Sequence, residues 1–149
     1  MAKISKHKKY IQSENSTPKL EEPMITYQSV MKIPSVEEFT YKKFQKIANK
    51  VPFTQKEWAS ILHLSERTLQ RYAKGNSSFE GIYVDRILQI EQLINLGLET
   101  FKTAQDLYNW LKKDKYVFGQ LLNFSSLEST HGIIEVTNEI GRILYGVYI

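Results

Sequence analysis

Two arginines one helical turn apart, Arg67 and Arg71, are the residues whose chemistry stands out in this sequence. They lie in the stretch 54–72, TQKEWASILHLSERTLQRY, whose pattern is that of two short helices joined by a tight turn. A guanidinium group can donate two hydrogen bonds to one guanine or form a charge-assisted pair with a phosphate. The spacing therefore predicts a DNA-binding face on the second helix, and an ordinary solvated face is the alternative.

Polar residues around the arginines extend this predicted face. Ser65 and Gln55 stand at the starts of the two helices, where the backbone N–H groups favour phosphate. The predicted DNA-binding residues are Gln55, Ser65, Arg67, Thr68, Gln70, Arg71 and Lys74.

The ends and the apolar sides of the two helices are also visible in the sequence. Thr54 with Glu57 matches a capping box, and Ser65 can cap the second helix. The residues predicted to be buried are Trp58, Ala59, Leu62, Leu69 and Tyr72. Two capped helices with facing apolar sides are typical of a helix-turn-helix.

The charge is unevenly divided along the chain, whose net charge is +4. Residues 40–79 carry eight basic and two acidic residues, whereas residues 80–149 carry six basic and nine acidic ones. Residues 1–19 have a net charge of +4 and residues 20–39 of −3. A polyanion would therefore be attracted to the helix-turn-helix and not to the C-terminal half.

The residue inventory argues against catalysis. There is no cysteine, and His7, His63 and His131 lie too far apart in sequence to suggest a shared metal site. No glycine-rich phosphate loop is present. We therefore expect no enzyme activity, no cofactor and no metal. No apolar run approaches the roughly 18 residues of a membrane span, so we expect a cytoplasmic protein without membrane contact.

The expected architecture is all-α, with a helix-turn-helix followed by a small helical domain. The length of 149 residues suits one domain, or two small ones that share a core, and the apolar content of 42% is enough for a packed interior. The predicted division is a disordered basic tail over 1–22, an N-terminal helical region over 23–78 and a helical domain over 79–149.

Outside residues 54–72, caps and apolar spacing predict further helices. The first begins at Ser35, capped with Glu38, and ends at Val51-Pro52. The others are a long helix over 79–96 capped by Ser77 with Glu80, a helix over 103–112 and a last helix over 133–144 after a break at Gly132. Residues 117–124 are predicted to form a short helix or a loop, Ser125 with Glu128 to form another cap, and no sustained strand is expected.

The C-terminal segment is aromatic and apolar: Tyr145, Gly146, Val147, Tyr148 and Ile149. Leaving such a patch in water is unfavourable, so it either folds back on the core or meets a partner. Trp110 has the same two interpretations, and a core position is favoured over an interface anchor.

Two C-terminal stretches together resemble the toxin-binding domain of the Xre/MbcA/ParS antitoxins. They are LYNWLKKDKYVFGQLLN and STHGIIEVTNEIGRILYGVYI. The shared features are Trp110-Leu111, Phe118-Gly119, Gly132 and the closing Ile143-Leu144-Tyr145-Gly146-Val147. The resemblance covers roughly residues 50–149, because this family places an Xre-type helix-turn-helix just upstream. Two departures are the missing proline after Gly119 and His63, which stands where many such turns carry glycine and predicts a non-standard turn.

The resemblance implies an antitoxin that neutralises its toxin by direct binding through the C-terminal domain and represses its own operon. The partners it implies are a RES-domain toxin, which depletes NAD, and operator DNA bound as a homodimer. The residues expected to bind the toxin are Tyr145, Gly146, Val147, Tyr148 and Ile149. One alternative is a stand-alone helix-turn-helix regulator whose C-terminal half only dimerises. Another is an inhibitor whose helix-turn-helix no longer binds DNA.

Overall fold

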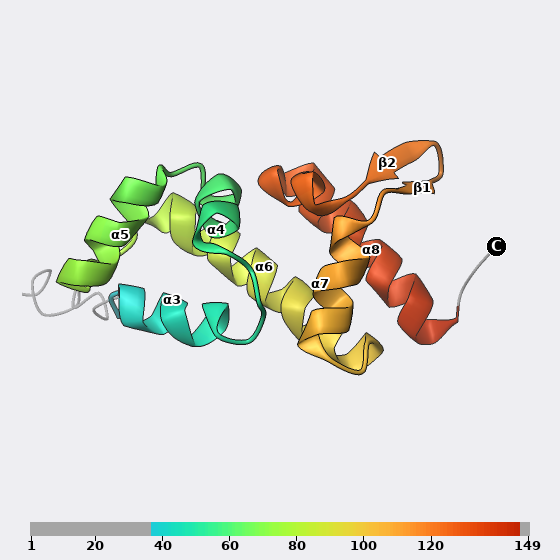
Figure 1. Ribbon diagram of the computed structural model, residues 1–149, viewed down its shortest axis with the longest axis horizontal. Coiled ribbons are helices and arrows are strands. Elements are labelled where there is room, and N and C mark those ends of the chain that lie inside the picture. Colours follow the sequence, from blue (N-terminus) through green and yellow to red (C-terminus); the bar gives the residue numbers. More distant parts are fainter. Residues whose placement is uncertain (1–36, 147–149) are drawn as a thin grey trace, which may run out of the picture. The chain divides into compact units, whose positions relative to one another are not determined.

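The computed structural model describes residues 37–146, which form helices and one short hairpin (Figure 1). The elements are α3 (Tyr41–Ala48), α4 (Gln55–Leu62), α5 (Glu66–Gly75), α6 (Gly81–Thr100), α7 (Ala104–Lys112), β1 (Lys115–Val117), β2 (Gln120–Leu122), the 3-10 helix η1 (Phe124–Glu128) and α8 (Thr130–Tyr145). The all-α prediction is confirmed, apart from the two-stranded sheet. The predicted tail over 1–22 lies outside the described residues.

The caps predicted for the helix-turn-helix are present. The Thr54 hydroxyl accepts a hydrogen bond from the Glu57 backbone N–H at 3.1 Å, and the Glu57 carboxylate accepts one from the Thr54 N–H at 3.0 Å. Ser65 accepts from the Thr68 N–H at 3.0 Å. Asn76 ends α5 in the left-handed conformation, with a φ of 45°. These caps set where the two helices begin and end, because each cap provides a hydrogen-bond partner for a backbone group at a helix end.

The first helix begins later than the sequence predicts. Glu37 to Phe39 are not helical, and α3 starts at Tyr41 with no side-chain cap from Thr40. The segment after α5 supplies the missing acceptors: Tyr41 N–H donates to the Ser77 carbonyl at 2.9 Å, and Lys42 N–H donates to Asn76 Oδ1 at 3.0 Å. A distant segment thus replaces the local cap that was predicted from Ser35, a residue outside the described part of the chain.

The long helix α6 runs from Gly81 to Thr100, two residues later at its start and four later at its end than predicted. The predicted cap is not formed, because Glu80 occupies the N-cap position and makes no side-chain cap bond. Gly97 lies inside the helix, where a Cβ atom would come within 2.6 Å of Leu107 on α7. Gly97 therefore marks a close helix contact and not a helix end.

The segment 115–128 differs most from the prediction. Strands β1 and β2 pair antiparallel, with Tyr116 opposite Leu121 and Val117 opposite Gln120. The cap predicted for Ser125 and Glu128 is wrong, since Asn123 and Ser126 form the capping box of η1. Helix α8 begins at Thr130, capped by Ser129, so Gly132 lies in its first turn instead of breaking the chain before it.

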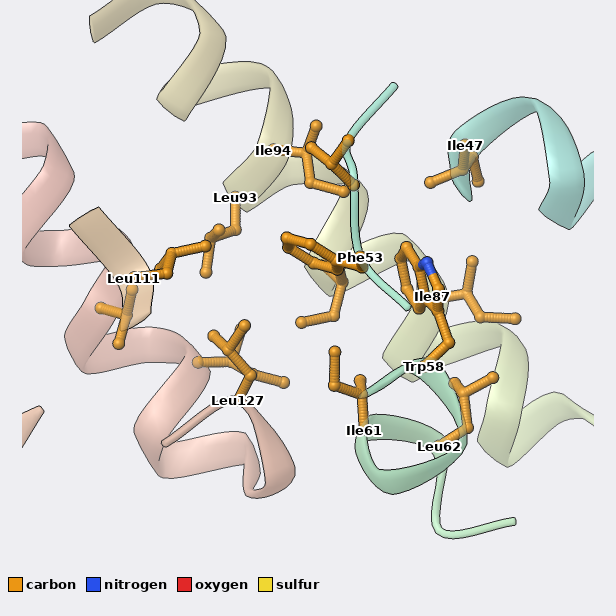
Figure 2. Packing of buried hydrophobic residues seen from close by; sticks show 14 of the residues in the cluster. Ile47, Phe53, Trp58, Ile61, Leu62, Ile87, Leu93, Ile94, Leu111 and Leu127 are labelled. Carbon is orange, nitrogen blue, oxygen red and sulfur yellow. The ribbon is translucent and has the colours of Figure 1, made fainter. Parts of the chain in front are cut away.

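One hydrophobic cluster connects the helix-turn-helix to the C-terminal helices (Figure 2). Phe53, in the loop before α4, lies 5.3 Å from the Trp58 ring, 5.8 Å from the Tyr108 ring and 4.9 Å from the Phe124 ring, measured between centroids. Helix α6 packs against α4, α7 and α8. Residues 38–146 accordingly lie within one compact unit, in which the predicted boundary at 78/79 falls between α5 and α6.

Glu57 fastens α4 to α7 in addition to capping α4. Its Oε1 accepts hydrogen bonds from Tyr108 Oη at 2.7 Å and from Lys112 Nζ at 2.9 Å. Burial would raise the pKa of the Glu57 carboxyl, but the hydrogen bonds from Tyr108, Lys112 and the Thr54 N–H outweigh it and lower the pKa. The folded state therefore favours the ionised carboxylate.

Replacing Glu57 with Gln should reduce the free energy of unfolding at pH 7 by about 1–2 kcal/mol, since a charge-assisted pair is lost while the cap survives. Because the folded-state pKa is lowered, the wild type keeps this contribution above the ordinary value of 4.5 and loses it as the pH falls through the folded-state value. Urea unfolding between pH 3 and pH 7 measures the difference. The exposed Glu99→Gln is the control, and an equal loss in both variants at every pH would contradict the role of Glu57.

Candidate DNA-binding and partner-binding surfaces

The predicted DNA-binding side chains on α5 lie on one exposed stripe. Arg67, Gln70, Arg71 and Lys74 are all exposed, and their spacing of three and four residues places them on one side of the helix. Leu69 is buried against the core on the other side. The stripe therefore offers two guanidinium groups, one ammonium group and one amide to a ligand.

The first turn of α5 is internally hydrogen-bonded. Ser65 Oγ donates to Thr68 Oγ1 at 2.8 Å, and Arg71 Nη2 lies 3.5 Å from the same Thr68 oxygen. Ser65 thus acts as a cap, with its proton directed at Thr68, while Arg71 is only loosely held. Arg71 is consequently free to turn toward an incoming base or phosphate.

Gln55 is the first residue of α4 and is exposed, so its side chain and the N-terminus of α4 both face solvent. Exposed backbone N–H groups at a helix start favour a phosphate oxygen. The position fits the phosphate contact predicted for Gln55, which stays a prediction.

The turn between α4 and α5 has the ordinary backbone despite its histidine. His63 adopts the left-handed conformation, with φ 57° and ψ 37°, which glycine adopts without strain. Its Nε2 lies 2.7 Å from the Glu128 carbonyl oxygen, which also accepts from Arg86 Nη1 at 2.9 Å. The predicted non-standard turn is therefore wrong, and the imidazole ties the turn to the end of η1. Sequence reasoning missed this contact, because nothing local links His63 with a carbonyl 65 residues away.

Replacing His63 with Ala should cost more stability than replacing it with Gly, by about 1 kcal/mol. Both variants lose the bond to Glu128, but only Ala retains the strain of the left-handed backbone. Parallel urea unfolding curves of the two variants measure the difference. Equal midpoints would mean that the turn relaxes out of the left-handed region.

The predicted toxin-binding segment is described only at its beginning. Tyr145 is the last residue of α8 and is 73% exposed, and Gly146 follows as a left-handed C-cap with a φ of 67°. Val147, Tyr148 and Ile149 lie outside the described residues. The glycine of the Tyr-Gly-Val motif thus has a local reason, since left-handed helix caps favour glycine.

Trp110, predicted as a core residue, is half-buried and packs against the edge of the core. Its ring lies 5.4 Å from the Phe101 ring, and Lys115 Nζ lies 4.1 Å from its centroid. Lys115 Nζ also donates to the carbonyls of Trp110 and Lys113, each at 2.7 Å, and so closes the end of α7. Burial lowers the pKa of Lys115 to about 8. These contacts hold the base of the β1–β2 hairpin.

Neither a metal cluster nor a membrane helix is found in the part of the chain that the structure describes. Residues 37–146 contain no group of three acidic or histidine side chains placed to hold a metal ion. None of their helices combines the length and hydrophobicity that a bilayer span requires.

Comparisons with known proteins bear on both halves of the described fold. Residues 40–91 match the family model of the antitoxin Xre-like helix-turn-helix domain. The fold is similar to a chain in the crystal structure of the M.tuberculosis MbcT–MbcA toxin–antitoxin complex, with a TM-score of 0.56 and 14% sequence identity. This similarity covers 72% of the present chain and 96% of that chain, and at this identity it is a likeness of fold. No curated protein matches the sequence. Residues 40–91 therefore form an antitoxin Xre-like helix-turn-helix domain, and the fold of the chain is similar to that of a chain from a toxin–antitoxin complex.

Proposed function

We propose that the chain neutralises a cognate toxin by direct binding through its C-terminal helices and represses its own operon through α4 and α5. The observation that supports repression most directly is the stripe of Arg67, Gln70, Arg71 and Lys74 on a helix that belongs to an antitoxin helix-turn-helix domain. Such helices enter the major groove, where arginine reads guanine and lysine contacts phosphate.

The toxin partner is inferred from the fold. The similar chain belongs to a complex described as toxin–antitoxin, and the present chain has an exposed Tyr145 at the end of its last helix. We propose a RES-domain toxin that depletes NAD, on the resemblance of the C-terminal stretches described above. The antitoxin itself carries no catalysis in this proposal.

A homodimer on the operator is part of the same proposal. Helix-turn-helix proteins commonly bind two half-sites about one helical turn apart, so two copies of α5 would read a pseudo-palindromic site. Binding to an operator also requires a cytoplasmic location.

Co-expression tests neutralisation. The protein should relieve the growth arrest caused by the toxin encoded beside its gene and should co-purify with that toxin. Deleting Val147–Ile149 should weaken toxin binding at least tenfold, because the truncation removes predicted contact residues while keeping α8 and its Gly146 cap. Operator binding by the truncated protein is the control. Unrelieved growth arrest with the full chain would contradict the antitoxin role and favour a stand-alone regulator.

A further inference from the structure

The β1–β2 hairpin exposes an unusual amount of apolar surface. Tyr116 and Leu121 are opposite each other in the pairing and so lie on the same face, where they are 77% and 45% exposed. Phe118, at the tip, is 75% exposed. Lys115 and Leu122 form the next pair, on the other face of the hairpin. This face holds the hairpin to the rest of the fold, since Leu122 is buried and Lys115 is half-buried.

The hairpin tip is also strained. Phe118 and Gly119 both have positive φ values, 50° and 80°, as a two-residue turn of the type I′ kind requires. Asn, Asp and Gly suit the first of these positions, whereas a large aromatic residue is rare there. A phenylalanine held in this conformation and left in water contributes little to folding, so a role in binding explains it better.

The hairpin tip rests on α8 through Arg142. The Arg142 guanidinium carbon lies 4.9 Å from the centroid of the Phe118 ring, and Arg142 Nε donates to Glu139 Oε2 at 2.8 Å. Arg142 Nη2 is buried, and no residue between 37 and 146 accepts a hydrogen bond from it. Tyr145 follows three residues after Arg142, on the same side of α8. A surface with exposed aromatic side chains at both ends thus runs from Phe118 over Arg142 to Tyr145.

We propose that Tyr116, Phe118, Leu121 and Arg142, together called the hairpin surface, form a second contact surface for the toxin. This inference rests on the proposed function and extends the predicted C-terminal contact through Tyr145. The chemistry that fits is an apolar pocket on the toxin that takes the Phe118 ring and covers Tyr116 and Leu121. Exposed aromatic and arginine side chains are the residue types that dominate the energetics of protein interfaces.

DNA and a second copy of this chain are the other occupants of the hairpin surface to compare with the toxin. DNA would not be drawn to it, since it is apolar and lies in the half of the chain with a net charge of −3. A second copy of this chain would bring the same apolar side chains, and the self-association measurement below separates it from the toxin. The toxin is favoured because the surface continues over Arg142 to Tyr145, where the predicted C-terminal contact with the toxin begins.

Replacing Phe118 with Asn separates a binding role from a structural one. Asn-Gly is the preferred type I′ sequence, so this variant should unfold at an equal or higher temperature than the wild type. Its affinity for the purified toxin, measured by calorimetry, should fall at least tenfold. Tyr116→Thr, which suits a strand, should also lose affinity. Ile82→Asn is the matched control, because Ile82 is 74% exposed on α6, away from the hairpin, and should bind normally.

The outcomes are distinguishable. If the wild type binds the toxin and both hairpin variants bind it equally well, the hairpin inference is overturned while the proposed function stands. A wild type that neither binds the toxin nor relieves growth arrest overturns the proposed function itself. Lower thermal stability of Phe118→Asn would assign Phe118 a structural role. Altered self-association with unchanged toxin affinity, measured by light scattering, would assign the surface to a second copy.

Discussion

Replacing Arg67 and Arg71 together with Ala should reduce the affinity for operator DNA about 100-fold or more. Each arginine that reads a base contributes about 1–3 kcal/mol, and 1.4 kcal/mol is a factor of ten in affinity. Folding should be nearly unaffected, because Arg67 and Arg71 are exposed and the contact from Arg71 to Thr68 is long, at 3.5 Å. Gel-shift or anisotropy titration against the upstream operator measures the loss.

The salt dependence separates base contacts from phosphate contacts in the same experiment. Each phosphate contact that is lost should reduce the slope of log affinity against log salt concentration by about 1. The matched control is Lys102→Ala with Lys113→Ala, which removes the same positive charge from two exposed lysines outside the helix-turn-helix. An equal effect of both double variants would mean that net charge, and not the face of α5, determines binding.

The helix-turn-helix could be predicted from the sequence because its signals are local. The side chains of Thr54, Glu57 and Ser65 each bond to a backbone N–H group three residues away. This pattern can therefore be recognised without knowing the rest of the fold. The buried positions Trp58 and Leu69 follow from the same helical spacing. The exposed face of α5 could therefore be predicted as well, although its binding to DNA stays a prediction.

The elements that were mispredicted depend on distant partners. The start of α3 is set by Ser77 and Asn76, more than 30 residues further along the chain, so the local pattern at Ser35 and Glu38 was misleading. The hairpin was missed because each strand has only three residues and its turn is Phe-Gly, which lacks the usual asparagine signal. The hairpin surface was missed for the same reason.

Gly132 is the position where a single methyl group should have the largest effect on stability. A Cβ atom there would lie 1.9 Å from the Ser126 carbonyl oxygen and 2.7 Å from its carbonyl carbon. Both are backbone atoms of η1, so no side-chain rotation can relieve the clash. Gly132→Ala should therefore reduce the free energy of unfolding by about 3 kcal/mol or more.

Two other glycines calibrate this expectation. A Cβ atom at Gly97 would meet the methyl groups of Leu107 at 2.6 and 2.7 Å, and a side chain can shift, so Gly97→Ala should cost only about 1–3 kcal/mol. At Gly141, within α8, the nearest atom is Leu96 Cδ2 at 4.0 Å. Because alanine favours a helix interior over glycine, Gly141→Ala should gain roughly 0.5–1 kcal/mol. Replacing glycine with alanine in α8 should thus lower the free energy of unfolding at position 132 and raise it at position 141.

The clash at Gly132 also bears on how the C-terminal helices are connected to the helix-turn-helix. Pushing η1 away from α8 would move the Glu128 carbonyl, which holds His63 in the helix-turn-helix and Arg86 on α6. Gly132→Ala should therefore destabilise α4 and α5 along with α8, and hydrogen exchange of amides in all three helices measures this directly. Faster exchange confined to η1 and α8 would show that the bonds to Glu128 do not couple the C-terminal helices to the helix-turn-helix.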